Sequence, residues 1–371
     1  MSVGHRDLIS HQQLMFLVYT LHFSATELLL PSSLAGTGKS GGWMAPLVSF
    51  FLSAVPVALM LGLLVRRHPH LGLGALSHHL LGRLPARLLM LLTTLFNVGL
   101  TALCLRDMVE AIPVAILPVT PTLAVALPFL LVAGYGAYCG AEVLARLAFF
   151  FMVIAVSLFS LVVVTLLRLV RALHLLPLWD QSPLQLVAAA WPTTGWYAES
   201  WTFLPLAAMV DRPQYAGRGL IAGALIAAVH LMSCTALSIG IFGHSLVAHF
   251  AFPIHALFQQ ITIGEFVERL DVILITICLL GMIVKTATHL WLAVDAAQFA
   301  LGLRNQRPLL LALGLAAVLW MLSIPNLPWL FAFSTTVWTP FSLCLGLGVP
   351  ALLLAASWIR ERQYRPPDIS S

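Results

Sequence analysis

The sequence predicts an all-α polytopic membrane protein with about ten transmembrane helices, on three observations. Hydrophobic residues make up 60% of the 371-residue chain and charged residues only 9%, and the mean hydropathy is +0.96. A soluble domain needs about a quarter of its residues charged, so this composition excludes a water-soluble protein. Long apolar runs recur along the chain, and polar residues interrupt two of them at corresponding points of its two halves.

A helix needs about twenty apolar residues to cross a bilayer, and this criterion predicts the spans in order. They are residues 14–34, 43–65, 84–105, 121–138, 143–170, 184–210, 220–242, 272–293, 309–323 and 329–358. A polar, proline-bearing connector at 176–183 separates two halves of similar span count. The glycine-rich stretch 35–42 is expected to be a flexible loop. The stretch 243–268 is too interrupted to span and is expected to lie at the interface or to act as a lid.

We expect one membrane domain over residues 1–366, with a first repeat at about 9–173, a second at about 184–359, and a cytoplasmic tail at 360–371. If successive spans cross the membrane in opposite directions, most arginines fall on one side of it. Because basic residues are enriched in cytoplasmic loops, this asymmetry places both termini in the cytoplasm and requires an even number of spans.

Each interrupted span carries one carboxylate. The first is broken at Ser24, Ala25, Thr26 and Glu27, and the second at residues 195–199, which end in Glu199. A carboxylate at bilayer depth is costly and normally marks a functional site. The free amides and carbonyls of half-helix ends can bind a zwitterion or a cation, and matching broken spans indicate a transporter-like binding site. The alternative is that each glutamate is only a structural hydrogen-bond partner between helices.

Lys285 is the third charge predicted inside a span, in residues 272–293. A lysine at mid-span cannot easily reach the interface, so we expect it to pair with Glu27 or Glu199. Its ammonium could then replace a bound sodium ion. A fixed ion pair, or a lysine left neutral by burial, is the competing interpretation. Thr288 lies one helical turn further on the same face and is expected to line the same cavity.

The sequence argues against several other classes. The basic residues form short clusters between apolar runs, a pattern that orients membrane helices and does not indicate nucleic-acid binding. We find no HExxH or paired Cys/His spacing for a metal, no GxSxG or other catalytic constellation, and no motif that requires a cofactor. The five cysteines stand alone in apolar stretches and are expected to pack as small residues.

Several stretches resemble the GerAB-type spore germination permeases, the B subunits of germinant receptors. The strongest match is TIGEFVERLD at residues 262–271, before the eighth span. Further agreement lies at residues 9–14, 30–31, 34–36, 105–106, 285, 307–308 and 324–327. The aromatic-Ala-Glu sequence at 197–199 is similar to the aromatic-Gly-Glu pattern of the family, whereas Glu27 stands where members are commonly apolar.

This resemblance implies a protein of the spore inner membrane with the fold of the APC superfamily, a LeuT-like 5+5 inverted repeat in which helices 1 and 6 are broken. It implies that a small germinant, often an amino acid, binds between these helices, and that an A-type membrane subunit and a C-type lipoprotein are partners. The expected ligand-binding residues are Ser24, Ala25, Thr26, Glu27, Trp196, Tyr197, Glu199, Lys285 and Thr288. A proton-coupled amino-acid transporter of the same superfamily is the main alternative, and a conduit for water or ions is another.

Overall fold

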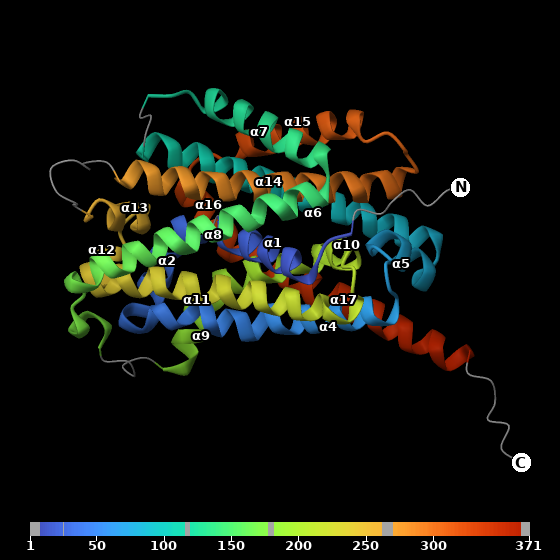
Figure 1. The fold of residues 1–371 in the computed structure, drawn as a ribbon, viewed down its shortest axis with the longest axis horizontal. Coiled ribbons are helices and arrows are strands. Elements are labelled where there is room, and N and C mark those ends of the chain that lie inside the picture. Colours follow the sequence, from blue (N-terminus) through green and yellow to red (C-terminus); the bar gives the residue numbers. More distant parts are fainter. Residues whose placement is uncertain (1–7, 25, 116–118, 177–181, 262–269, 365–371) are drawn as a thin grey trace, which may run out of the picture.

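The protein is an assembly of helices in the computed structural model, which describes residues 8–24, 26–115, 119–176, 182–261 and 270–364. Figure 1 shows the long helices lying side by side in one bundle, with α1 near its centre. The 262–269 portion of the motif at 262–271 lies outside the described residues. Within the described ranges the structure contains no strand beyond one isolated bridge between Ile9 and Val210.

The described residues of the first half of the chain form eight α-helices and four short segments of other helical type. These are α1 (His11–Phe23), α2 (Thr26–Gly38), η1 (Lys39–Met44), α3 (Ala45–Ser49), the π-helix η2 (Phe50–Ala54), α4 (Val55–Arg67), α5 (Leu73–Leu81), α6 (Arg83–Ala115), α7 (Thr122–Cys139), α8 (Ala141–Leu166), η3 (Leu167–Leu169) and η4 (Ala172–Leu175).

The second half follows the same pattern of long helices joined by short ones. They are α9 (Pro183–Ala198), η5 (Glu199–Phe203), α10 (Leu204–Ala208), η6 (Pro213–Tyr215), α11 (Ala216–Phe242), α12 (His244–Val247), α13 (Pro253–Phe258), α14 (Leu270–Leu301), α15 (Arg307–Ser323), α16 (Leu327–Phe333), the π-helix η7 (Ser334–Trp338) and α17 (Thr339–Tyr364).

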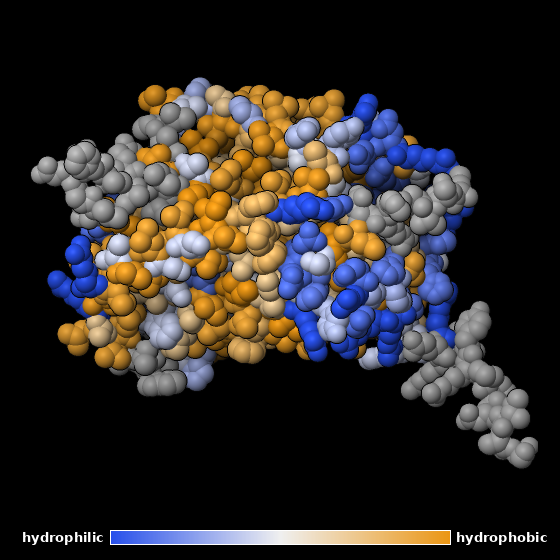
Figure 2. Space-filling model, in the orientation of Figure 1, coloured by the Kyte–Doolittle hydropathy of each residue, from blue (hydrophilic) through white to orange (hydrophobic). Residues whose placement is uncertain are grey.

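Seven helical stretches of the described chain are long and apolar enough to cross a membrane, and α15 is a shorter apolar helix. This confirms a polytopic, helical membrane protein. The predicted first span corresponds to α1 and α2, and the predicted sixth span to α9, η5 and α10; most of their residues lie outside these seven stretches. Figure 2 shows hydrophobic residues over the middle of the bundle and polar ones gathered at the end where α4, α5 and α17 end.

The first interruption lies between α1 and α2. α1 begins at a capping box in which the Ser10 hydroxyl accepts from the Gln13 amide and the Gln13 side chain accepts from the Ser10 amide. α1 ends at Phe23, and the next amide, that of Ser24, still donates to the Thr20 carbonyl at 3.2 Å. α2 begins at Thr26, two residues later, so the predicted interruption at 24–27 coincides with this junction.

The second interruption is the 3₁₀ segment η5, which joins α9 to α10. The prediction placed it at residues 195–199 and was displaced, because α9 continues through Ala198 and only Glu199 belongs to the segment. Two features explain the position. Pro205 has no amide hydrogen, so an α-helical bond to the Trp201 carbonyl cannot form. The Ser342 hydroxyl donates to the Gly195 carbonyl at 2.7 Å and fixes the last turns of α9 against α17.

The two interrupted helices are joined at one end by backbone hydrogen bonds. The Ile9 amide donates to the Met209 carbonyl, and the Asp211 amide donates to the Ile9 carbonyl, each at 3.0 Å. At the other end α2 packs against α9. α9 also begins with a capping box, formed by Ser182 and Gln185, that repeats the one at Ser10. The two broken helices therefore run past each other in opposite directions.

Two expectations for connecting segments are corrected or refined. The stretch 35–42 is not a flexible loop, because α2 continues to Gly38 and η1 follows, with Lys39 in a left-handed conformation (φ 48°). At Gly42 a Cβ atom would lie 2.2 Å from the Leu34 carbonyl oxygen, so this tight reversal requires glycine.

The described part of the stretch 243–268 contains α12 and α13, which are far too short to span a bilayer.

Candidate functional site

A buried ion pair lies where the second interruption meets α14. The Lys285 ammonium is 2.9 Å from Glu199 Oε1, and both side chains are 0% exposed. Glu199 is the first residue of η5, and Lys285 lies in the middle third of α14. Of the two partners predicted for Lys285, the structure therefore gives Glu199.

The ammonium also lies 4.9 Å from the centre of the Trp196 ring, within the range of a cation–π interaction. Trp196 lies in the last turn of α9, and Glu199 is the residue after it. The aromatic face and the carboxylate both favour a cation at this position, which the Lys285 ammonium occupies.

Part of the hydrogen-bonding capacity of this site is unused. Glu199 Oε2 and His289 Nε2 are both buried and have no hydrogen-bond partner among the described residues. His289 Nε2 lies 3.9 Å from Glu199 Oε1, and its other ring nitrogen bonds to Asn97 Oδ1 at 3.0 Å. A buried polar atom without a partner costs about 1–3 kcal/mol, and its presence calls for a functional or structural reason. These atoms could therefore accept or donate to a ligand.

A second polar contact connects the two interrupted helices directly. The Ser200 hydroxyl lies 2.8 Å from His22 Nε2 and 2.8 Å from the Tyr197 carbonyl oxygen. The rings of His22 and Tyr197 meet edge to face, with centres 4.9 Å apart. All three residues are buried. His22 lies in the last turn of α1, so this contact joins the end of α1 to η5.

The predicted residues of the first interruption contribute less to the described site. Ser24 is buried and donates its hydroxyl hydrogen to the Thr20 carbonyl at 2.7 Å, which satisfies it within its own helix. Ala25 lies outside the described residues. Thr26 and Glu27 begin α2, and their side chains are also outside the described part of the structure. Their ligand-binding role stays a prediction.

Thr288 is buried, as expected for a residue lining the site, but its hydroxyl donates to the Val284 carbonyl at 2.7 Å. Its hydrogen-bonding capacity is thus partly used within α14. His289, four residues after Lys285, is a second residue of α14 that approaches Glu199, at 3.9 Å. His289 and His22 are not among the predicted ligand-binding residues, although the i, i+4 spacing of Lys285 and His289 is visible in the sequence.

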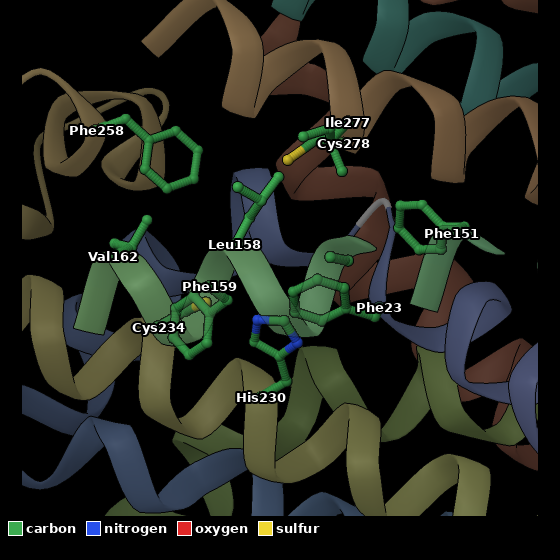
Figure 3. A pocket seen from close by; sticks show the side chains of 11 residues that line it. Phe23, Phe151, Leu158, Phe159, Val162, His230, Cys234, Phe258, Ile277 and Cys278 are labelled. Carbon is green, nitrogen blue, oxygen red and sulfur yellow. The ribbon is translucent and has the colours of Figure 1, made fainter. Parts of the chain in front are cut away.

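A small cavity lies beside the first interruption, next to Phe23 (Figure 3). Its volume is about 30 Å³, and aromatic and aliphatic side chains of α8, α11, α13 and α14 form most of its wall. His230 lies at its edge, stacked on Phe23 with ring centres 3.9 Å apart and hydrogen-bonded to the Tyr19 hydroxyl at 2.8 Å. Such a volume holds about one water molecule and is too small for an amino acid.

The described residues contain no group of three or more metal-ligating side chains. The negative charge of the Glu199 carboxylate is balanced by the Lys285 ammonium, which belongs to the protein itself.

A family model for spore permeases, described as "Spore germination protein", matches residues 8–327, which include both interruptions and Lys285. Among curated proteins, none matches the chain.

Proposed function

Because the chain belongs to the spore germination protein family, we propose that it is the B-type subunit of a germinant receptor. In this proposal it binds a small germinant, an amino acid, at a mid-membrane site between the two broken helices. The signal that a germinant has bound is then passed to an A-type membrane subunit and a C-type lipoprotein. The protein lies in the spore inner membrane with both termini in the cytoplasm.

The proposed architecture is a LeuT-like 5+5 inverted repeat with α1–α2 as broken helix 1 and α9–α10 as broken helix 6. Its support is the correspondence between the two halves. The same Ser-x-x-Gln capping box begins α1 and α9, and Glu27 and Glu199 lie equally far beyond it, from 10 to 27 and from 182 to 199. Repeats of this kind place the ligand between the two broken helices.

The buried pair of Glu199 and Lys285 is the observation on which the proposed ligand class rests. An amino acid is a zwitterion, so it can offer an ammonium to Glu199 and a carboxylate to Lys285. Insertion between them would replace one ion pair by two and leave the net charge of the buried site unchanged. A ligand with a single charge would leave one protein charge without a partner, at a cost of several kcal/mol.

Signalling requires that the ligand bind one arrangement of the half-helices better than another. Coupling free energies between sites are typically about 1–3 kcal/mol. The contact of Ser200 with His22 lets a ligand at Glu199 change the junction of α1 and α2. The shift would then pass to the partner subunits.

The test is a stability screen of the purified full-length chain in lipid nanodiscs over amino acids, sugars and nucleosides. A ligand at one hundred times its Kd should stabilise the protein by about 2.7 kcal/mol. Glu199→Gln should abolish the stabilisation. Glu142→Gln is the matched control, because Glu142 is paired with Arg146 at the surface of α8 and should leave it unchanged. No saturable binding of any such compound, with or without the partner subunits, would refute the proposal.

The second candidate is a proton-coupled amino-acid transporter of the APC superfamily. It is favoured by the same pair, because a buried carboxylate and a buried ammonium between the proposed repeats can exchange a proton as the repeats move. Uptake of labelled amino acid into proteoliposomes that is abolished by Lys285→Met would favour transport over sensing. Saturable binding without uptake would favour the receptor.

A further inference from the structure

A long apolar groove lies on the outer face of the bundle, away from the interrupted helices. α7 and α15 form its two walls, and Leu290 of α14 lies at its floor. Its volume is about 740 Å³, within the range of pockets that bind small molecules. Figure 1 shows α7 and α15 side by side at the upper edge, above α14, and Figure 2 shows that this edge is largely hydrophobic.

The walls are apolar over most of their length and polar at one end. Residues at i, i+3, i+4 and i+7 of each helix line the groove, so one face of α7 and one face of α15 contribute. The lining residues of the walls are Leu127, Leu130, Leu131, Gly134, Tyr135 and Tyr138 on α7, and Arg307, Leu310, Leu311, Gly314 and Leu315 on α15. Two of them, Gly134 and Gly314, have no side chain to fill the space.

Arg307 marks the polar end. Its guanidinium donates to the Tyr138 hydroxyl at 3.0 Å and lies 5.6 Å from the centre of the Tyr138 ring. The Gln306 side chain bonds to the Tyr138 carbonyl and holds the two helix ends together. A guanidinium has five N–H donors, and no carboxylate of the described residues forms an ion pair with this one. Arg307 is exposed and available to an anion.

The length of the groove corresponds to one leaflet. At about 1.5 Å per residue, Leu127 to Tyr138 covers about 16 Å and Arg307 to Leu315 about 12 Å. This is about half of the 30 Å hydrocarbon core. A partner's transmembrane helix would need the whole thickness, whereas an acyl chain needs only its own leaflet. We propose that this groove binds the acyl chains of one anionic phospholipid and that Arg307 binds its phosphate, as basic pockets between membrane helices do.

The test uses the purified full-length protein in neutral detergent and native mass spectrometry. Phosphatidylglycerol and phosphatidylcholine with identical chains are the probes, and the thermal midpoint is the second measurement. One phosphatidylglycerol should be retained in preference to phosphatidylcholine. Arg307→Gln should weaken phosphatidylglycerol binding about fivefold and leave phosphatidylcholine nearly unchanged. Arg146→Gln is the matched control, because that exposed arginine is paired with Glu142, outside the groove.

A second variant fills the groove. No atom lies within 4 Å of a Cβ built at Gly134, so Gly134→Leu occupies the space without a clash and should weaken both lipids at least tenfold. Gly348→Leu on α17, where the surroundings are equally open, is its control. Equal retention of the two lipids with no effect of Arg307→Gln would overturn the proposal, as would unchanged binding in Gly134→Leu. Stabilisation by inorganic phosphate alone to the same extent as by phosphatidylglycerol would also contradict it. So would a Gly134→Leu variant that loses a co-purifying partner chain but keeps its lipid binding.

Discussion

Removing one partner of the buried pair should cost far more stability than removing both. In Lys285→Met the Glu199 carboxylate stays buried, and the nearest described side chain that could replace the ammonium is His289, 3.9 Å away. Breaking a fully buried ion pair in this way typically costs about 3–5 kcal/mol, because the remaining charge loses its partner but not its burial. Glu199→Gln should cost a similar amount by leaving the ammonium against Trp196 alone.

The double variant Glu199→Gln, Lys285→Met has no charge to bury. Replacing both members of such a pair by neutral groups of similar size is often close to neutral. We therefore expect the double variant to recover most of the loss, so that the coupling free energy between the two positions exceeds the cost of either single variant, about 3–5 kcal/mol. The assay is equilibrium unfolding by denaturant in lipid or detergent, followed by tryptophan fluorescence, for the four members of the cycle.

The control cycle uses Glu142 and Arg146, a pair on α8 in which the side chains are 29% and 64% exposed. Exposed pairs one helical turn apart contribute about 0.3–0.5 kcal/mol, so this cycle should give almost no coupling. Additive losses at Glu199 and Lys285, equal to those of the control, would refute the reasoning. They would mean that the two charges reach water and that the site is not closed.

Two further predictions concern the packing around the site. Gly195→Ala should destabilise the protein by about 1–3 kcal/mol in the same unfolding assay, because its Cβ would lie 2.6 Å from the Thr339 Cα atom, and Gly348→Ala should not. An unchanged unfolding midpoint for Gly195→Ala would contradict the close contact of α9 with α17. Tyr19→Phe should cost about 1 kcal/mol by removing the hydrogen bond to His230, and no loss would show that water replaces it.

The approximate positions of the two interruptions could be predicted because a bilayer offers no water to polar groups inside it. A carboxylate such as Glu199 in an otherwise apolar run has no solvent, so the sequence alone indicates that the backbone or another side chain must satisfy it. The exact end of α9 could not be predicted in the same way. The end of α9 depends on Ser342 of α17, whose hydroxyl donates to the Gly195 carbonyl. The two residues are 147 positions apart in the sequence. The proline at 205 was the local signal that could have moved the prediction toward η5.

The site residues that were missed share a physical reason. His22 and His289 both lie within predicted spans, and a histidine in such a position is usually a core residue with one satisfied nitrogen. Each has a partner on another helix, and these contacts are visible only where α1, η5 and α14 cross in the structure. The residues in contact are far apart in sequence, so their order along the chain does not predict them. Thr288 illustrates the converse. Its helical spacing places it on the face of Lys285, but a threonine in a helix can bond to the carbonyl four residues before it, and this one does.

If the protein works as proposed, these contacts predict the direction of its conformational change. His22, Ser200 and Glu199 connect the end of α1 to η5, whereas the backbone bonds of Ile9 join the opposite ends of the same two helices. A ligand that separates Glu199 from Lys285 therefore acts near one end of α1 while the other end stays fixed, so α1 would pivot about Ile9 and not translate. Crosslinking a cysteine at Ile9 to one at Val210 should then leave ligand binding intact. Loss of binding in the crosslinked protein, restored by reduction, would show that the fixed end must also open.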